Sequence, residues 1–154
     1  MIQALIVGAS SFLYLLPAYS FYCAPATNFW NRFGVWLFIV VSICSASADG
    51  SITAIKRDAA PKLQRIAEMI DRWTATSGGA YAVAMFFLKP HPDPVWLAFE
   101  IGVMITCVLP LHFARVTPVS HAWQWVALHC LWHFTSAFTV AWVAPHYTGN
   151  RLIG

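Results

Sequence analysis

Charged residues are scarce in this sequence: they make up 10% of its 154 residues, whereas hydrophobic residues make up 59%. A soluble domain carries roughly a quarter of its residues as Asp, Glu, Lys or Arg. So little charge cannot cover a surface that faces water, which excludes an ordinary soluble globular protein. We therefore expect the lipid bilayer to be part of the solvent, and we predict a single transmembrane domain over residues 1–154.

Two further shortages exclude other classes of protein. The formal net charge is only +3, so the chain lacks the strongly basic face on which nucleic-acid binding depends. The chain has four cysteines and no CxxC pair, and most of them stand in apolar segments, where Cys behaves as a small hydrophobe. We therefore expect neither a nucleic-acid partner nor a disulfide framework.

The sequence does contain a series of apolar segments separated by short connections. The connection at 89–94 reads Lys-Pro-His-Pro-Asp-Pro, and its three prolines end any helix there. A segment of about 20 apolar residues is long enough to cross the hydrocarbon layer, and Pro17 predicts a kink in the first segment. The sequence thus predicts an all-α integral membrane bundle of about five transmembrane helices, at residues 2–22, 33–55, 73–88, 95–114 and 122–144.

Most of the charge is concentrated between the second and third of these segments. Apolar residues recur there at helical spacing: Leu63, Ile66, Ile70 and Trp73. This pattern predicts an amphipathic helix over 61–72 that opens at Pro61, lies at the membrane interface and continues into the third span.

The distribution of Lys and Arg predicts the orientation of the chain. Most basic residues lie between the second and third spans, and Arg115 lies between the fourth and fifth. Because basic loops remain on the cytoplasmic side, we expect the N-terminus on the positive side, cytoplasm or matrix, and the C-terminus opposite. An organellar inner membrane, such as that of the mitochondrion, is the first candidate compartment.

Two histidines, His129 and His133, stand four residues apart in the last apolar segment and therefore project from one face of a helix. Ionisable side chains are costly inside a membrane, so such a pair predicts a functional site. Other ionisable residues are expected toward the same side of the membrane: Asp49, Asp71, His112 and His121. The sequence places only Glu100 within the membrane on the opposite side.

This group of residues is open to three interpretations. In the first, His129 and His133 bind one divalent metal such as zinc. Its third ligand is Asp49 or His112, and Asp71 accepts a proton from water or orients a ligand. In the second, the same side chains join helices through hydrogen bonds without a metal. In the third, His112 pairs with His129 or His133 as the axial ligands of a haem.

Three short motifs stand out in this order: Val35-Trp-Leu-Phe38 through Asp49-Gly50, Ile70-Asp71-Arg-Trp followed by Ser77-Gly78, and His129-Cys-Leu-Trp-His133. In these motifs the chain resembles a known group of membrane proteins, the CREST superfamily. This group includes the alkaline ceramidases, the adiponectin and progestin receptors, and myomaker. The likeness covers about residues 10–90 and 120–140.

The resemblance implies a seven-helix fold around a buried zinc that three histidines hold. It also implies that a Ser and an Asp assist a water molecule that attacks a lipid amide. On the matching positions, His129 and His133 would be zinc ligands. Asp71 would orient the water, and Ser42 would be the assisting serine.

The chain departs from the family pattern in two ways. The family's remaining histidine stands four residues after the serine, and counting from Ser42 gives Ala46, which cannot bind a metal. A shifted register pairs Ser45 with Asp49, whose carboxylate would substitute for the imidazole. Asp49-Gly50 also matches the acidic residue that the family often carries just after this motif, which favours the Ala46 register. The second departure is size, because the sequence predicts five spans and the missing pair would fall between the fourth and the fifth.

These departures favour a non-catalytic, multi-pass membrane subunit of a larger membrane complex, built on a reduced CREST-like scaffold. An organellar energy-transducing assembly is the first candidate, with membrane lipids and other membrane subunits as partners. The alternative is a zinc-dependent lipid amide hydrolase similar to ceramidases, with Asp71 and Ser42 as catalytic residues. A receptor or fusion factor, as in other branches of the superfamily, is a third class.

Overall fold

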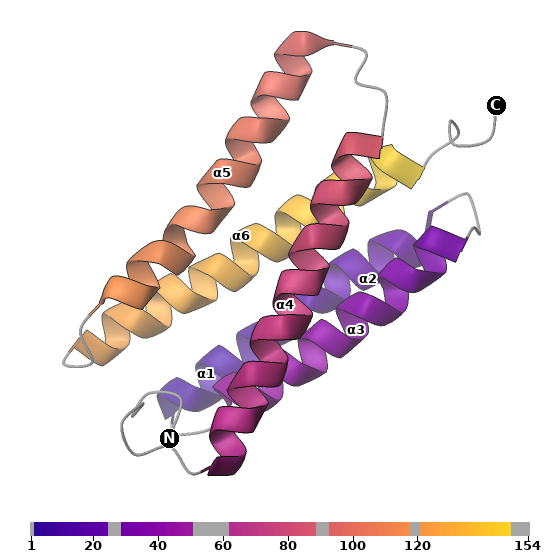
Figure 1. Cartoon of the computed structure of the whole chain (residues 1–154). Coiled ribbons are helices and arrows are strands. Elements are labelled where there is room, and N and C mark those ends of the chain that lie inside the picture. The colour runs from indigo at the N-terminus through magenta and orange to yellow at the C-terminus, as the bar shows by residue number, and fades with distance from the viewer. Residues whose placement is uncertain (1, 25–28, 51–61, 89–92, 118–120, 149–154) are drawn as a thin grey trace.

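The computed structural model describes residues 2–24, 29–50, 62–88, 93–117 and 121–148. Every regular element in these ranges is a helix, which confirms the all-α prediction for this part of the chain. The stretch from α1 to α2 runs in one direction, and α3, α4, α5 and α6 then alternate in direction along the bundle (Figure 1). In chain order they are α1 (Ile2–Ser10), the short 3-10 helix η1 (Ser11–Tyr14), α2 (Leu15–Tyr22), α3 (Phe29–Asp49), α4 (Lys62–Leu88), α5 (Pro94–Val116) and α6 (Ala122–Thr148).

Three stretches of helix are long and apolar enough to cross a membrane: Ile2–Tyr22, Phe29–Asp49 and Leu97–Val116. They correspond to the first, second and fourth predicted spans. The other two predicted spans lie in α4, which is more polar, and in α6. The first turns of α4 carry charged side chains, and α6 contains both histidines and several hydroxyl residues.

The observed helix limits differ from the predicted spans in the middle of the chain. α3 begins at Phe29, earlier than the predicted residue 33, and ends at Asp49 with Gly50 in a turn. The predicted continuation to residue 55 lies outside the described residues. The amphipathic segment and the third span form one continuous helix, α4, as the periodicity indicated.

The predicted disturbance near Pro17 takes the form of a 3-10 turn. Pro17 has no backbone N–H, and its ring crowds the carbonyl group of Leu13, four residues earlier. The chain adopts 3-10 geometry over Ser11–Tyr14 and then resumes as α2. The first apolar stretch is therefore helical throughout, with a local tightening near its middle.

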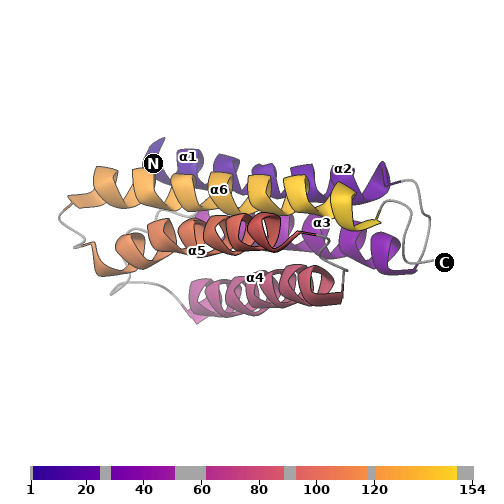
Figure 2. The ribbon, with the colours of Figure 1, turned by 90° about the horizontal axis from the view of Figure 1, so that it is seen from above.

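The N-terminal stretch from α1 to α2 packs against both α3 and α6. α4 packs mainly on α3 and to a lesser extent on α6, whereas α5 packs on α6. Figure 2 shows α4 on one side of the bundle and α1–α2 on the other. The amino ends of α1, α4 and α6 and the carboxyl ends of α3 and α5 therefore gather at one end of the molecule (Figure 1).

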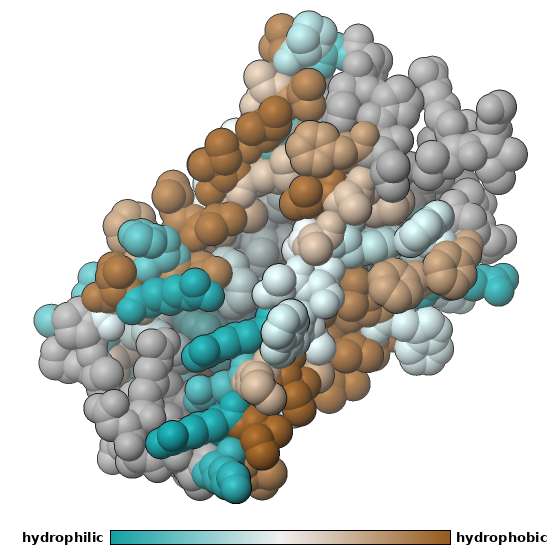
Figure 3. Space-filling model, in the orientation of Figure 1, coloured by the Kyte–Doolittle hydropathy of each residue, from teal (hydrophilic) through white to brown (hydrophobic). Residues whose placement is uncertain are grey.

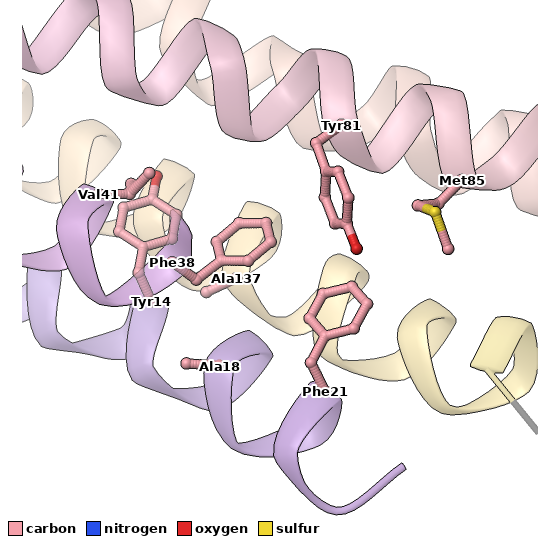
Figure 4. Close-up of a cluster of buried hydrophobic side chains, with 8 residues drawn as sticks. All are labelled: Tyr14, Ala18, Phe21, Phe38, Val41, Tyr81, Met85 and Ala137. Atoms are coloured by element: carbon pink, nitrogen blue, oxygen red, sulfur yellow. The ribbon is translucent and has the colours of Figure 1, made fainter. Parts of the chain in front are cut away.

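The largest cluster of buried apolar side chains joins η1 and α2 to α3, α4 and α6 (Figure 4). Phe21 stacks on Phe38 with 5.9 Å between ring centroids, and the edge contact between Phe21 and Tyr81 measures 5.5 Å. The Tyr81 hydroxyl donates to the carbonyl oxygen of Trp30 at 2.8 Å. These contacts anchor the second half of α4 to α2 and α3.

Replacing Gly34 by Ala is expected to destabilise the bundle. A Cβ atom at this position would lie 2.9 Å from the Phe21 ring and 2.9 Å from the Tyr81 hydroxyl, so the aromatic packing must shift. Such overpacking costs about 1–3 kcal/mol and should lower the thermal unfolding midpoint in detergent. Gly102→Ala is the matched control, because nothing lies within 4 Å of a Cβ atom there. Equal midpoints for the two variants would contradict this packing.

Candidate metal centre

Three ionisable side chains from two helices converge near one end of the bundle. Asp49 is the last residue of α3, and His129 and His133 stand on successive turns of α6. Each offers one potential metal-ligand atom, and these atoms all lie within 4.8 Å of one another. Asp49 Oδ2 is 3.1 Å from His129 Nε2 and 3.5 Å from His133 Nε2. The structure thus brings together three residues that the sequence proposes as metal ligands.

The two imidazole rings are held by neighbours on their own helix. They stand nearly perpendicular to each other, with 4.6 Å between centroids and an interplanar angle of 86°. The Trp125 ring packs on His129 at 4.7 Å between centroids, and the Trp132 ring packs against both histidines. These contacts restrict rotation of the rings and keep both Nε2 atoms near Asp49.

Asp49 is positioned by contacts at the C-terminal end of α3. Ser45, one turn earlier, donates from its hydroxyl to Asp49 Oδ2 at 3.3 Å. Gln64, in the first turn of α4, donates from its amide nitrogen to the Ala48 carbonyl oxygen at 2.7 Å. The last carbonyl groups of a helix lack partners within the helix, so this bond both satisfies one of them and fixes α4 to the end of α3.

His133 is the most deeply buried member of the group, with an exposed fraction of 0%. Its Nδ1 atom is hydrogen-bonded to Ser10 Oγ at 2.7 Å, whereas its Nε2 atom has no hydrogen-bond partner among the described residues. Native proteins rarely leave a buried polar atom unpaired. Here that nitrogen lies 3.5 Å from a carboxylate oxygen of Asp49, an arrangement that a cation would satisfy.

The donor set fits a zinc ion. Zinc binds histidine nitrogen and carboxylate oxygen at about 2.0–2.2 Å, and a tetrahedral arrangement then separates neighbouring donors by about 3.4 Å. The two distances measured from Asp49 Oδ2, 3.1 and 3.5 Å, agree with that separation. Three protein ligands leave a fourth position for water or substrate, as in catalytic zinc sites.

A cavity of about 850 Å³ lies beside these residues, lined by α3, α4, α5 and α6. This volume is in the range of pockets that hold a small-molecule ligand, about 300–1,000 Å³. Asp49 and His129 both line it. Other ionisable side chains line the cavity from α4 and α5: Glu68, Asp71, Arg72 and Arg115.

The rest of the cavity wall is made of small and apolar residues. Figure 3 shows hydrophilic side chains on the first turns of α4 and hydrophobic side chains along α5, on either side of the hollow. The apolar wall includes Ala82 and Val83 of α4, Met104 and Val108 of α5, and Val140 of α6. The cavity is therefore amphipathic, with a polar region beside Asp49 and apolar walls beyond it.

Asp71, which the resemblance implies as the water-orienting acid, lines this cavity from α4. Its carboxylate interacts with the Ser45 hydroxyl and with the nearby charge of Asp49. The Oδ1 atom of Asp71 is buried without a hydrogen-bond partner in the described part of the chain. Asp71 is thus placed to exchange a proton inside the cavity, next to the ligand group but outside it.

The structure distinguishes between the two serines considered from the sequence. The Ser42 hydroxyl is buried and donates to the Ser11 carbonyl oxygen at 3.1 Å, so it joins α3 to η1. The Ser45 hydroxyl instead contacts Asp49. This arrangement matches the shifted register, in which Asp49 takes the position of the third ligand.

Two other sequence positions lie apart from the metal ligands. Ala46 lines a second pocket together with Gly8 of α1. His112 is exposed on α5 beside Phe113, with 5.8 Å between ring centroids. The structure does not bring His112 to the histidine pair of α6, as the haem interpretation requires.

Sequence reasoning missed three residues that support the site: Ser10, Tyr14 and Gln64. Ser10 is separated from His133 by 123 positions in the chain, and a single serine in an apolar span is ordinary. Gln64 stands in the amphipathic segment, where a polar residue is expected to face water. Gln64 instead lies on the buried side of that helix. Which side is buried depends on how α4 packs, and the sequence does not show this.

Comparison with known protein families, curated proteins and solved structures finds no match for this chain. The resemblance to the CREST superfamily therefore stays a prediction from short motifs. What supports a metal centre is the geometry of the chain's own residues.

Gln64→Ala is expected to loosen the junction between α3 and α4. The substitution removes a buried donor and leaves the Ala48 carbonyl group unpaired, which costs about 1–3 kcal/mol. Faster hydrogen exchange at the end of α3, measured by mass spectrometry, should accompany a lower unfolding midpoint. Gln124→Ala, at an exposed position of α6, is the control. If both variants exchange alike, the Gln64 bond does not hold this junction.

Proposed function

We propose that the chain is a multi-pass integral membrane protein with five membrane-spanning helices. Three stretches have the length and composition for a span, and α4 and α6 lie beside them in the bundle (Figure 2). The charged first turns of α4 then lie at the membrane interface. The distribution of Lys and Arg places the N-terminus on the cytoplasmic or matrix side, and an organellar inner membrane is the first candidate compartment.

Within that membrane, we propose that the chain is a zinc-dependent hydrolase of a lipid amide. The observation that carries this proposal is the convergence of Asp49, His129 and His133 beside the cavity, where His133 Nε2 has no hydrogen-bond partner among the described residues. The sequence favoured a non-catalytic subunit because Ala46 stands where the family has its remaining ligand and because a pair of helices is missing. Asp49 supplies a third donor from the same helix end, and the helices that are present line a cavity beside it.

Different residues of the chain would bind the metal, transfer the proton and position the carboxylates. Asp49, His129 and His133 would hold the metal. Zinc in such a site acts as a Lewis acid that polarises a carbonyl group and makes water more acidic. Asp71 accepts the proton of the attacking water and returns it to the amine that leaves when the carbon–nitrogen bond breaks. The Ser45 hydroxyl donates to Asp49 and also lies near the Asp71 carboxylate.

The cavity suits a lipid as the substrate. On α4 the small and mostly apolar part of the lining runs from Ala75 to Val83, a length of about 12 Å at 1.5 Å per residue. Apolar walls of that length suit a hydrocarbon chain. Arg72 and Arg115, at the polar region, suit a hydrated headgroup at the membrane interface. The amide bond would then lie beside Asp49 and His129.

The second candidate is the non-catalytic subunit of a larger membrane complex. The observation that favours it is the packing of α5, which lies against α6 without comparable contact to another described helix. The cavity between α4 and α5 would then hold a helix of a partner subunit, and the polar cluster would join helices through hydrogen bonds or a structural metal.

Metal analysis of the purified chain separates the two candidates. We expect about one zinc per chain in detergent, bound by three protein ligands, and loss of zinc together with lipid amide hydrolysis in His133→Ala. His112→Ala is the matched control and should retain both, because His112 lies apart from the ligand group. A wild-type chain that binds no zinc and co-purifies with a stoichiometric membrane partner would overturn the hydrolase and support the second candidate.

Filling the cavity tests the binding mode of the lipid. Gly79 lines the cavity, and nothing lies within 4 Å of a Cβ atom there, so Gly79→Leu adds bulk without a backbone clash. We expect kcat/KM for a long-chain lipid amide to fall about tenfold or more, with zinc content unchanged and a short-chain amide less affected. Gly102→Leu, also in open space but outside the cavity lining, should behave as wild type. Equal kinetic constants for the two variants would show that the hydrocarbon chain of the lipid does not bind in this part of the cavity.

A further inference from the structure

Ser10 connects the N-terminal helix to the candidate metal centre. It is the last residue of α1, immediately before the 3-10 turn. Its Oγ atom makes two short contacts, one of 2.7 Å to the Val7 carbonyl oxygen and one of 2.7 Å to His133 Nδ1. Both contacts have hydrogen-bond length, so the position of the single hydroxyl hydrogen decides which ring nitrogen of His133 carries a hydrogen.

The hydrogen of Ser10 must point to Val7. A carbonyl oxygen can only accept, so the contact with Val7 is a hydrogen bond only if Ser10 donates. Ser10 then has no hydrogen left for His133, and its oxygen must accept from an Nδ1–H group. The reverse assignment would leave two acceptor oxygens, Ser10 Oγ and Val7 O, facing each other at 2.7 Å.

This assignment leaves a lone pair on His133 Nε2. A neutral imidazole carries one hydrogen, and complete burial of the ring disfavours the charged form. The lone pair lies 3.5 Å from Asp49 Oδ2 and has no donor among the described residues. A histidine in this tautomer is ready to bind a cation and poorly suited to a metal-free hydrogen bond with the carboxylate.

A second contact fixes the register between the N-terminal stretch and α6. The Ser136 hydroxyl donates to the Trp132 carbonyl oxygen at 2.6 Å, so the 3.1 Å contact between Tyr14 and Ser136 has Tyr14 as its donor. The Tyr14 ring also makes a T-shaped contact with the His133 ring, with 5.4 Å between centroids. Ser10 and Tyr14, one turn apart, therefore hold His133 through its Nδ1 atom and through this ring contact.

We infer that Ser10 is a positioning residue of the metal centre, which holds His133 as the Nδ1-protonated tautomer and directs Nε2 toward Asp49. The expected effect on metal binding rests on the proposed function, whereas the tautomer itself does not depend on a bound metal. Ligating histidines are commonly held in this way by a hydrogen bond to the other ring nitrogen. Here the partner is a hydroxyl from the far end of the sequence.

The tautomer is measured first, on the wild-type chain. Histidine-labelled protein, stripped of metal with a chelator, gives 15N shifts that distinguish a protonated from an unprotonated ring nitrogen. The His133 signals are assigned by their loss in His133→Gln. We expect Nδ1 protonated and Nε2 bare. A protonated Nε2 in the wild-type chain would overturn the inference, whether or not the chain binds zinc.

Zinc affinity is measured next, by competition with a chromophoric chelator. Ser10→Ala should weaken zinc binding about 10–100-fold, and Ser10→Thr, which keeps the hydroxyl, should restore most of it. Ser11→Ala is the matched control, because Ser11 is buried and also donates to Val7 but does not contact His133. Wild-type affinity in a folded Ser10→Ala would refute the inference alone, whereas a wild-type chain without zinc affinity would refute the proposed function.

Discussion

The structure depends on one constraint: a carboxylate at the end of α3 faces two imidazoles of α6 within an apolar bundle. Asp49 Oδ2 lies within 3.5 Å of both Nε2 atoms, and no described donor satisfies that of His133. Burying such groups is costly unless they are paired or coordinate a metal. The elements around them can be understood as supports for this contact. α1 and η1 hold the histidine, Ser45 and α4 hold the end of α3, and α5 covers one side of α6.

Different interactions hold the helices together at the two ends of the bundle. At one end, aromatic side chains of α2, α3 and α4 interlock around Phe21 and Tyr81 and fix the helices by packing. At the other end, hydrogen bonds and ionisable groups replace that packing, and α4 and α5 are far enough apart to leave a cavity between them. A stiff apolar core thus holds a more open polar site, which is how a site keeps its geometry while it admits a ligand.

Much of this arrangement was predictable, and each failure has a physical reason. Apolar segments and proline-rich connections predict the helices, and the periodicity of 61–72 predicts that it continues into the next helix, as α4 does. The spacing of His129 and His133 predicts one helical face. The sequence favoured Ser42 as the serine of the motif, but it is Ser45 that contacts Asp49, because the rotation of α3 decides which serine does so.

By itself, the sequence determined that this chain is helical and largely apolar. It also determined that His129 and His133, four residues apart, share one face of a helix. These properties are local: they follow from composition and from the 3.6-residue period of a helix. Only the tertiary structure decided that Asp49 is the carboxylate that joins the histidines, that His112 stays apart, and that Ser10 reaches His133 across 123 positions. Those contacts depend on the rotation and depth of each helix against its neighbours, and many side chains share in setting them.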